Sequence, residues 1–147
     1  MPANHSLKII LWNAHAVTQK SMELLEFAAT ENADVLVITE SFLKPGNNFN
    51  LPGYTLARLD RTHSNGGGVV IAVKKPIKFV IQPHYRTTII EAIGVELSTT
   101  NGPLLIIAAY CPRQCYDGNG MSNKFKNDLV KLTRHRKNFV VACDLNA

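Results

Sequence analysis

Three short apolar segments of this chain each run into a side chain that carries an amide or carboxylate oxygen. These segments and the residues that follow them are 9–12 with Asn13, 35–39 with Glu40, and 139–143 with Asp144 and Asn146. Short apolar runs are typical of buried strands, and ligands of open α/β sheets bind beyond the carboxyl ends of the strands. Amide and carboxylate oxygens are hard ligands that suit magnesium. We therefore expect an α/β fold in which several strand ends form one polar site.

The segment between the first two apolar runs has the spacing of an amphipathic helix. Its apolar residues recur at Met22, Leu24, Leu25, Phe27, Ala28 and Ala29, with Ser21 as a candidate cap and Asn32 near the end. A strand over 8–12, this helix and a strand over 35–39 together predict a βαβ unit with parallel strands.

The rest of the chain predicts more strands and a second helix. Extended segments are expected at 54–59, 69–73, 79–82, 89–97 and 104–110, with a hairpin turn at Asn101-Gly102 and loops at 44–53 and 112–120. The second helix is expected from Met121 to Arg134, with an apolar side of Phe125, Leu129, Val130 and Leu132. The prediction is an α/β fold with a mixed sheet and two main helices, forming one domain over 8–147 after a tail at 1–7.

The composition fits a globular domain with a moderate basic excess. The chain has 147 residues, of which 46% are hydrophobic and 18% are charged, so it is long and apolar enough for a core and is not a disordered segment. Its net charge of +5 suits an anionic partner such as nucleic acid. Many proteins of this charge bind no nucleic acid, and the basic side of the second helix is more typical of a solvated face than of a DNA contact.

Three cysteines are expected to be reduced thiols. Cys111, Cys115 and Cys143 form an odd set, and the first two have the wrong spacing for a zinc site. The N-terminus has no apolar signal region, and no apolar run approaches the length of a membrane span. These features predict a soluble, nuclear or cytoplasmic protein that is not secreted.

Each candidate site residue also has a purely structural interpretation. Asn13 is typical of a turn residue that bonds its own backbone, whereas Glu40 follows so apolar a run that it needs a partner or a cation. Tyr110 ends an apolar strand, so its hydroxyl either emerges at the sheet edge or completes the core. Arg113 either binds phosphate through its planar fork or is solvated.

The segment Gly66-Gly67-Gly68 has two readings as well. It lacks the Lys-Ser or Lys-Thr of a phosphate-binding loop and enters a strand rather than a helix, so a tight turn is the favoured interpretation. Asp60 and Arg61 stand just before it and are expected to form an ion pair that locks the turn. Arg61 is also a candidate contact to nucleic acid.

The order of these motifs resembles that of a known superfamily. In chain order, the motifs are Trp12-Asn13, Ile-Thr-Glu ending at Glu40, Leu-Asp-Arg-x4-Gly-Gly-Gly-Val from Leu59, Tyr-x-Pro from Tyr110, and Asp-Leu-Asn-Ala from Asp144. Together they resemble the endonuclease/exonuclease/phosphatase superfamily over essentially the whole chain from Lys8 onward. Within it the chain looks like the apurinic-endonuclease-like domain of insect-type non-LTR retrotransposon reverse transcriptase proteins.

The resemblance implies a four-layer α/β sandwich that hydrolyses phosphodiesters with Mg²⁺ or Mn²⁺. It implies Glu40 as the metal carboxylate and Asn13 as its neighbour at metal and phosphate. Tyr110 would bond a phosphate oxygen, Asp144 would align the attacking water, and Asn146 would contact the scissile phosphate. The implied partner is DNA, nicked at the target site to prime reverse transcription, with Arg61 and Arg113 as candidate DNA contacts.

Three departures from the family pattern bear on activity. Cys143 stands where the family usually has Gly, and His15 stands where the related branch often has Asn. A further Asp and the terminal Ser-Asp-His segment are not found in these 147 residues. We therefore expect a C-terminally incomplete fragment that is inactive or very slow alone, with the second sheet mostly missing and an apolar face exposed.

Two other functions stay open at this stage. The first is a catalytically dead retroelement remnant that at most binds nucleic acid, and the second is a phosphomonoesterase on the same fold. The expected protein partners are the missing C-terminal half or the reverse transcriptase domain of a full-length relative.

Overall fold

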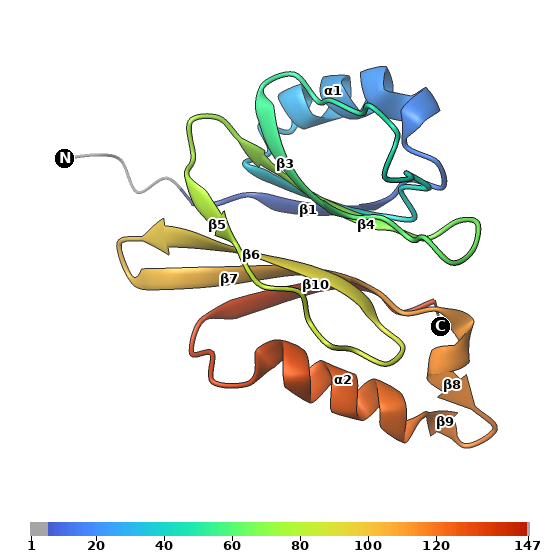
Figure 1. The fold of residues 1–147 in the computed structure, drawn as a ribbon. Helices are drawn as coiled ribbons and strands as arrows, with labels where there is room; N and C mark the ends of the chain where they lie inside the picture. The colour runs from blue at the N-terminus through green and yellow to red at the C-terminus, as the bar shows by residue number, and fades with distance from the viewer. Residues whose placement is uncertain (1–5, 147) are drawn as a thin grey trace.

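The computed structural model describes residues 6–146, so most of the tail predicted at 1–7 and the final Ala147 lie outside the described residues. Two four-stranded sheets lie face to face, with one main helix on the outer side of each (Figure 1). The layers therefore run helix, sheet, sheet, helix. This is the α/β sandwich with two main helices that the sequence predicts, and that prediction is confirmed.

The first sheet comes from the N-terminal half of the chain, with strand order β1-β2-β4-β3. Its strands are β1 (Ile9–Asn13), β2 (Val35–Thr39), β3 (Tyr54–Leu59) and β4 (Val69–Lys74). β1 and β2 are parallel and are joined through η1 (Thr18–Lys20) and α1 (Ser21–Thr30), which is the predicted βαβ unit. β4 is antiparallel to both of its neighbours.

The second sheet has strand order β10-β7-β6-β5. Its strands are β5 (Phe79–Ile81), β6 (Glu91–Thr99), β7 (Gly102–Tyr110) and β10 (Phe139–Asp144). β7 and β10 are parallel, whereas β6 is antiparallel to β5 and β7. Between β7 and β10 lie η2 (Arg113–Cys115), the small hairpin of β8 (Tyr116–Asp117) and β9 (Gly120–Met121), and α2 (Asn123–Thr133).

The core has three apolar layers because alternate residues of a strand point to opposite faces. In β2, Leu36 and Ile38 pack with α1, whereas Val35 and Val37 pack against the second sheet. In β7, Ile106 and Ala108 face the first sheet, whereas Leu105 and Ile107 pack with Phe125 and Leu132 of α2. All these strand residues are fully buried or nearly so.

The expectation that the second sheet would be mostly missing is wrong. Four strands of it are present among the described residues, and two of them are nine residues long. Because these strands cover the inner face of the first sheet, that face is not open to water. The β6–β7 hairpin, a strong local element, supplies most of this cover. Its pairing runs to Thr99 and Gly102, so Thr100 and Asn101 form the turn.

Both helices differ in detail from the prediction. α1 already includes Ser21, and the residue before it makes no side-chain cap. α2 begins at Asn123, where Ser122 caps the helix by accepting a hydrogen bond from the Phe125 amide. Leu129 and Val130, predicted on the apolar side of α2 with Phe125 and Leu132, are exposed, whereas Phe125 and Leu132 are buried.

The expectation of three reduced thiols is also wrong. Cys111 and Cys115 form a disulfide, and Cys143 is free. The chain turns back on itself at η2, where the Cys115 amide bonds the Pro112 carbonyl, and this brings the two Cα atoms to 6.1 Å, within the range that a disulfide spans. None of the helices in the described part of the chain is long and apolar enough to cross a membrane.

Candidate active site

The candidate site lies where the two parallel strand pairs end. Asn13 is the last residue of β1, and Glu40 follows β2 directly. In the other sheet Tyr110 and Asp144 are the last residues of β7 and β10, and they face each other in register. β1 and β2 both contact β10 across the sandwich. Four polar side chains from two sheets are thus delivered to one edge of the molecule.

Hydrogen bonds join these residues directly. The Asn13 amide nitrogen Nδ2 donates to Oδ2 of Asp144 at 2.6 Å, which connects the first sheet to the second. The other carboxylate oxygen of Asp144 accepts from the Asn146 backbone at 3.0 Å. Nδ2 of Asn146 reaches the Tyr110 hydroxyl at 3.4 Å. Four of the residues singled out from the sequence, Asn13, Tyr110, Asp144 and Asn146, therefore form one hydrogen-bonded cluster, although their chemical roles stay predictions.

Glu40 is held in an unusual backbone conformation. Its φ is +50°, a region that residues other than glycine rarely adopt. His15, Ala16, Phe42 and Asn146 share positive φ values, so most of the described non-glycine residues with this strain border the same site. Backbone strain of this kind concentrates at functional sites, where the surrounding structure enforces it.

His15 is a neighbour of the site that the sequence did not nominate. Its Nδ1 lies 3.2 Å from Oε2 of Glu40, and its backbone amide donates to Oδ1 of Asn13 at 3.2 Å. It also packs its ring edge on Phe42. In the sequence, His15 stands out only because it replaces the Asn that the related branch often has at this position. That difference from the family pattern does not by itself predict a contact to Glu40.

Tyr110 is held as a neutral phenol. Burial, hydrogen bonding to Glu40 and the charge of Glu40 raise its pKa to about 12; the Arg61 charge opposes this shift, and the Asp144 charge adds to it. The hydroxyl keeps its proton throughout the physiological range, so Tyr110 can donate a hydrogen bond to an anionic oxygen.

Arg61 lies behind the site and is already paired. Its Nε donates to Oε1 of Glu91, and its side chain is only 14% exposed. Its guanidinium carbon lies 5.8 Å from the centre of the Tyr110 ring. The predicted Asp60–Arg61 ion pair is wrong, because Asp60 pairs with Arg58 at 2.7 Å.

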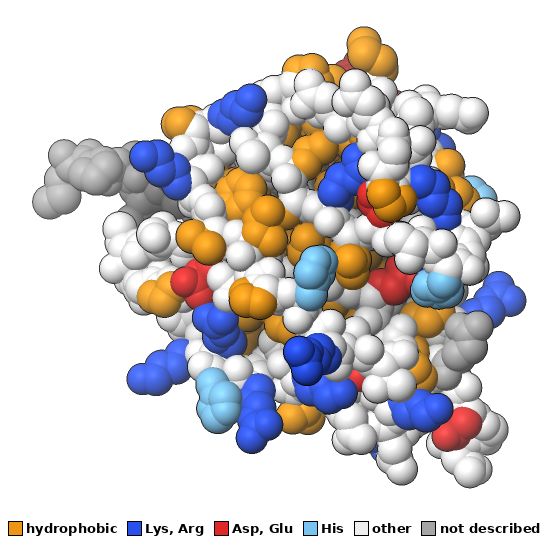
Figure 2. Space-filling view, viewed as in Figure 1, with side chains coloured by type: hydrophobic (Ala, Val, Ile, Leu, Met, Phe, Trp, Pro, Cys, Tyr) orange, Lys and Arg blue, Asp and Glu red, His pale blue; other side chains and the backbone are white. Residues whose placement is uncertain are grey.

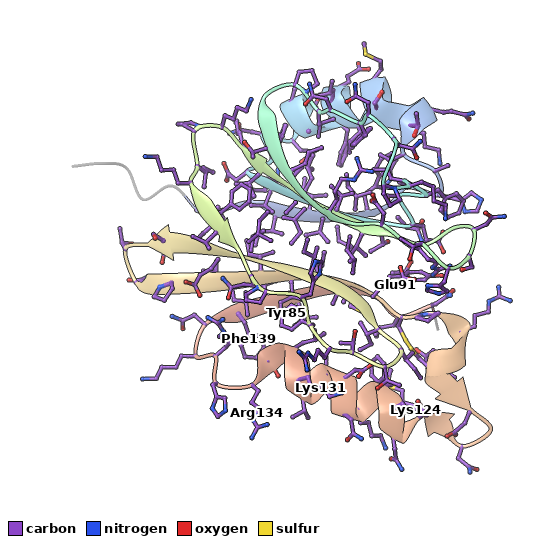
Figure 3. The ribbon with its side chains drawn as sticks, in the orientation of Figure 1. Tyr85, Glu91, Lys124, Lys131, Arg134 and Phe139 are labelled. Atoms are coloured by element: carbon purple, nitrogen blue, oxygen red, sulfur yellow. A yellow bond between two sulfur atoms is a disulfide. The ribbon has the colours of Figure 1, made fainter. Side chains whose placement is uncertain are left out.

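Two of the three glycines, Gly67 and Gly68, lie directly against this buried pair. A Cβ on Gly67 would fall 2.2 Å from the Arg61 guanidinium carbon, and φ there is +63°. The Gly68 amide donates to Oε2 of Glu91 at 2.8 Å, where Glu91 begins β6 (Figure 3). The glycines lie at the end of the loop between β3 and β4, which spans residues 60–68, and all three have positive φ. The predicted tight turn is not seen as such, and the lack of side chains leaves room for the arginine. Glu91 was missed because its partners are distant in the sequence.

The other predicted DNA contact, Arg113, is exposed at the first position of η2. Figure 2 shows further Lys and Arg side chains gathered on the part of this face where Figure 1 places α2. Lys124, Lys126 and Lys131 of α2 are exposed. The basic excess is therefore available at the surface.

The donor set fits a hard divalent cation. Glu40 and Asp144 offer carboxylate oxygens, and Asn13 offers an amide oxygen. Across the part of the chain that the structure describes, no group of three or more His, Cys, Asp and Glu forms a closed metal cage. Mg²⁺ needs no such cage, since it is commonly held by one or two carboxylates together with water and substrate phosphate. A soft zinc centre does not fit these oxygen donors.

Comparison with known proteins gives a family and several relatives. Residues 10–147 match the family described as the Endonuclease/Exonuclease/phosphatase family. The RNA-directed DNA polymerase from mobile element jockey of Drosophila funebris is 32% identical over 108 residues, which are 73% of this chain and 12% of that protein. The probable RNA-directed DNA polymerase from transposon BS of Drosophila melanogaster is 32% identical over 144 residues, which are 96% of this chain and 15% of that protein. The chain thus spans only a small part of these relatives.

Solved structures share the fold. The endonuclease domain of TRAS1, a telomere-specific non-LTR retrotransposon, has a TM-score of 0.68 at 17% identity, covering 96% of this chain and 61% of that one. The Xenopus laevis APE2 catalytic domain has a TM-score of 0.69 at 15% identity, covering 96% and 59%. The resemblance predicted from the ordered motifs is confirmed by the family match and the mobile-element relatives.

Proposed function

The chain belongs to the endonuclease/exonuclease/phosphatase family, and from that premise we propose that it acts as the DNA-nicking domain of a retrotransposon protein. The reaction is hydrolysis of a phosphodiester bond with Mg²⁺ or Mn²⁺. The observation that carries this proposal is the Asn13–Asp144 hydrogen bond, which joins the ends of two strands from opposite sheets at 2.6 Å.

Glu40 and Asn13 would hold the metal ion. When bound there, the ion would neutralise charge on the phosphate and polarise its oxygen. The strained backbone at Glu40 supports this role, because strain of this kind concentrates at functional sites.

The remaining side chains act on the phosphate and on water. Asp144 is oriented by the side chain of Asn13 and by the backbone N–H of Asn146, and it aligns the attacking water and accepts its proton. The protonated Tyr110 hydroxyl donates to a phosphate oxygen. Nδ2 of Asn146 lies beside that hydroxyl and is a second donor to the same charge.

DNA is the proposed substrate, and the cut would expose a 3′ hydroxyl that primes reverse transcription. The mobile-element relatives are named as RNA-directed DNA polymerases, which supports this context. The exposed Arg113 and the basic surface of α2 would attract the phosphate backbone. A reverse transcriptase domain, or the rest of the nuclease domain, is the proposed protein partner.

The proposal is tested by nicking of supercoiled plasmid with magnesium. Glu40→Ala and Asp144→Ala should each lower the rate by at least about 100-fold, whereas Glu26→Ala, an exposed carboxylate on α1, should leave it unchanged. This chain covers 61% and 59% of the two solved neighbours. We therefore expect slow nicking by the 147 residues and faster nicking by a chain extended with the following segment of the BS relative.

Two results would contradict this function. Equal nicking by all variants would indicate a contaminating nuclease. Salt-sensitive DNA binding without nicking, even in the extended chain, and indifferent to magnesium and to Glu40→Ala, would favour the non-catalytic alternative.

A further inference from the structure

A cavity of about 480 Å³ lies beside the candidate active site. One wall is the loop from Leu59 to Ser64 after β3, the other is the segment from Thr87 to Glu91 that leads into β6, and Pro112 closes one side. Its volume is in the range of sites that bind small molecules.

The second wall is preformed by a buried carboxylate. Asp128 of α2 is fully buried and accepts hydrogen bonds from the backbone amides of Thr88, Ile89 and Ile90 at 2.6–3.1 Å. Lys131, one turn further along α2, donates to the Arg86 carbonyl at 3.1 Å from the same side (Figure 3). Satisfied buried networks are rigid, so this wall does not need to be ordered by a ligand.

The charged groups of the cavity are already neutralised. Asp60 pairs with Arg58, and Arg61 pairs with Glu91. The side chains that remain available to a ligand are exposed hydroxyls and one imidazole, those of Thr62, His63, Ser64 and Thr88. Apolar surface comes from Leu59, Ile89 and Pro112. Such a lining suits a flat, uncharged group with hydrogen-bonding edges better than it suits a free phosphate.

The cavity adjoins the phosphate-handling residues. Arg61 forms part of its wall and also lies over the Tyr110 ring. Glu91, at the other wall, faces Tyr110 in the β6–β7 register. Pro112 follows Tyr110 by two residues. An uncharged group bound here would therefore sit next to a phosphate bound at Tyr110.

From this arrangement we propose that the cavity binds one nucleoside of the cut DNA strand, adjacent to the scissile phosphate. By selecting that base, it contributes to the sequence preference of nicking. The inference rests on the proposed function for the neighbouring phosphate, but its binding step can be measured without catalysis.

The test is an NMR titration of the amide resonances of the 147-residue chain. The probes are thymidine 5′-monophosphate and the tetranucleotide dT4. We expect saturable shifts at 62–64 and 87–90, with tighter binding of dT4 because its phosphates reach the strand ends beside the cavity. Thr62→Trp, which fills the cavity, should weaken binding by at least about tenfold, and His63→Ala should weaken it less. Thr100→Trp, at the far hairpin turn, should bind as the unmodified chain does.

Several outcomes overturn the inference. One is that the shifts are confined to residues outside the cavity. Another is that the mononucleotide and dT4 bind equally well, which would indicate a site for free nucleotides. A third is that binding is unchanged in both Thr62→Trp and His63→Ala. Failure of the nicking proposal is distinguishable, because a chain that does not nick DNA would still show the saturable shifts in the cavity. Glu40→Ala should slow nicking without moving those shifts. Where nicking is measured, Thr62→Trp should change the distribution of nick positions, and Thr100→Trp should not.

Discussion

Asn13 and Asp144 lie 131 positions apart in the sequence, and their side chains are joined by a 2.6 Å hydrogen bond across the two sheets. Neither residue could reach the other unless β1 and β10 ended at the same edge of the sandwich. The bond orients one carboxylate oxygen of Asp144, while the backbone of Asn146 binds the other.

Replacement of Asn13 should therefore damage catalysis more than stability. Asn13→Ala removes the donor that orients Asp144, and we expect nicking to fall by about 100-fold. The pair lies at the surface, so the unfolding midpoint in urea should hardly change. A large loss of stability without a specific loss of rate would assign Asn13 a structural role instead.

The pKa of the Tyr110 hydroxyl should lie well above that of an ordinary tyrosine. Its pKa is raised to about 12 by burial first and then by Glu40. Because the folded-state pKa exceeds the unfolded value of 10.0, its contribution to stability is complete below pH 10 and is lost as the pH rises toward 12. NMR of ¹³C-labelled tyrosine rings should show this late titration, and Tyr110→Phe should remove the signal. A midpoint near 10 would contradict the described surroundings of the hydroxyl.

Gly67 should tolerate no side chain. In Gly67→Ala the new Cβ would fall 2.2 Å from the Arg61 guanidinium carbon at a φ of +63°, so the Arg61 side chain must shift and its pair with Glu91 is disturbed. We expect a loss of about 1–3 kcal/mol in the free energy of unfolding, from the strained φ and the displaced arginine. Gly53→Ala is the matched control, because φ there is also positive (+84°) but nothing lies within 4 Å of its Cβ position. Equal effects of the two changes in urea unfolding would refute the close packing at Gly67.

Asp128 should stabilise the fold in a pH-dependent way. Burial alone would raise its pKa, but the amides of Ile89, Thr88 and Ile90, with the charge of Lys131, lower it overall. Asp128→Asn should cost about 3 kcal/mol of unfolding free energy, since buried amides lose a charged acceptor. Asn127→Ala, exposed on the same helix, is the control.

The sign of the pH effect follows from the lowered pKa. The contribution of Asp128 is complete above the unfolded carboxyl pKa of about 3.9 and is lost as the pH falls through the lower folded-state value. The stability difference between the chain and Asp128→Asn should therefore shrink only in strong acid. A difference that disappears already near pH 6 would contradict the assignment.

The sequence predicted what local patterns encode. Apolar runs and helical spacing located nearly all main strands and both helices, and the oxygen-bearing residues at the strand ends were found because each directly follows an apolar run. Groups whose partners are distant in the chain were not found. Glu91 binds Arg61 30 positions away, and Asp128 binds amides 38–40 positions away, and neither stands out locally. The disulfide was missed because the η2 turn that closes it has no periodic signal.

The central claim is that Asn13, Glu40, Tyr110 and Asp144 surround one divalent cation, and paramagnetic broadening by Mn²⁺ tests it most directly. In a titration of the ¹⁵N-labelled chain, we expect the amide resonances of these four residues and of His15 to broaden first. Glu40→Gln should require at least about tenfold more Mn²⁺, because even the loss of a group that only supports a metal ligand commonly costs about 10- to 100-fold in affinity. Glu26→Gln should behave as the unmodified chain. Broadening that begins elsewhere, or that is unchanged in Glu40→Gln, would contradict the claim.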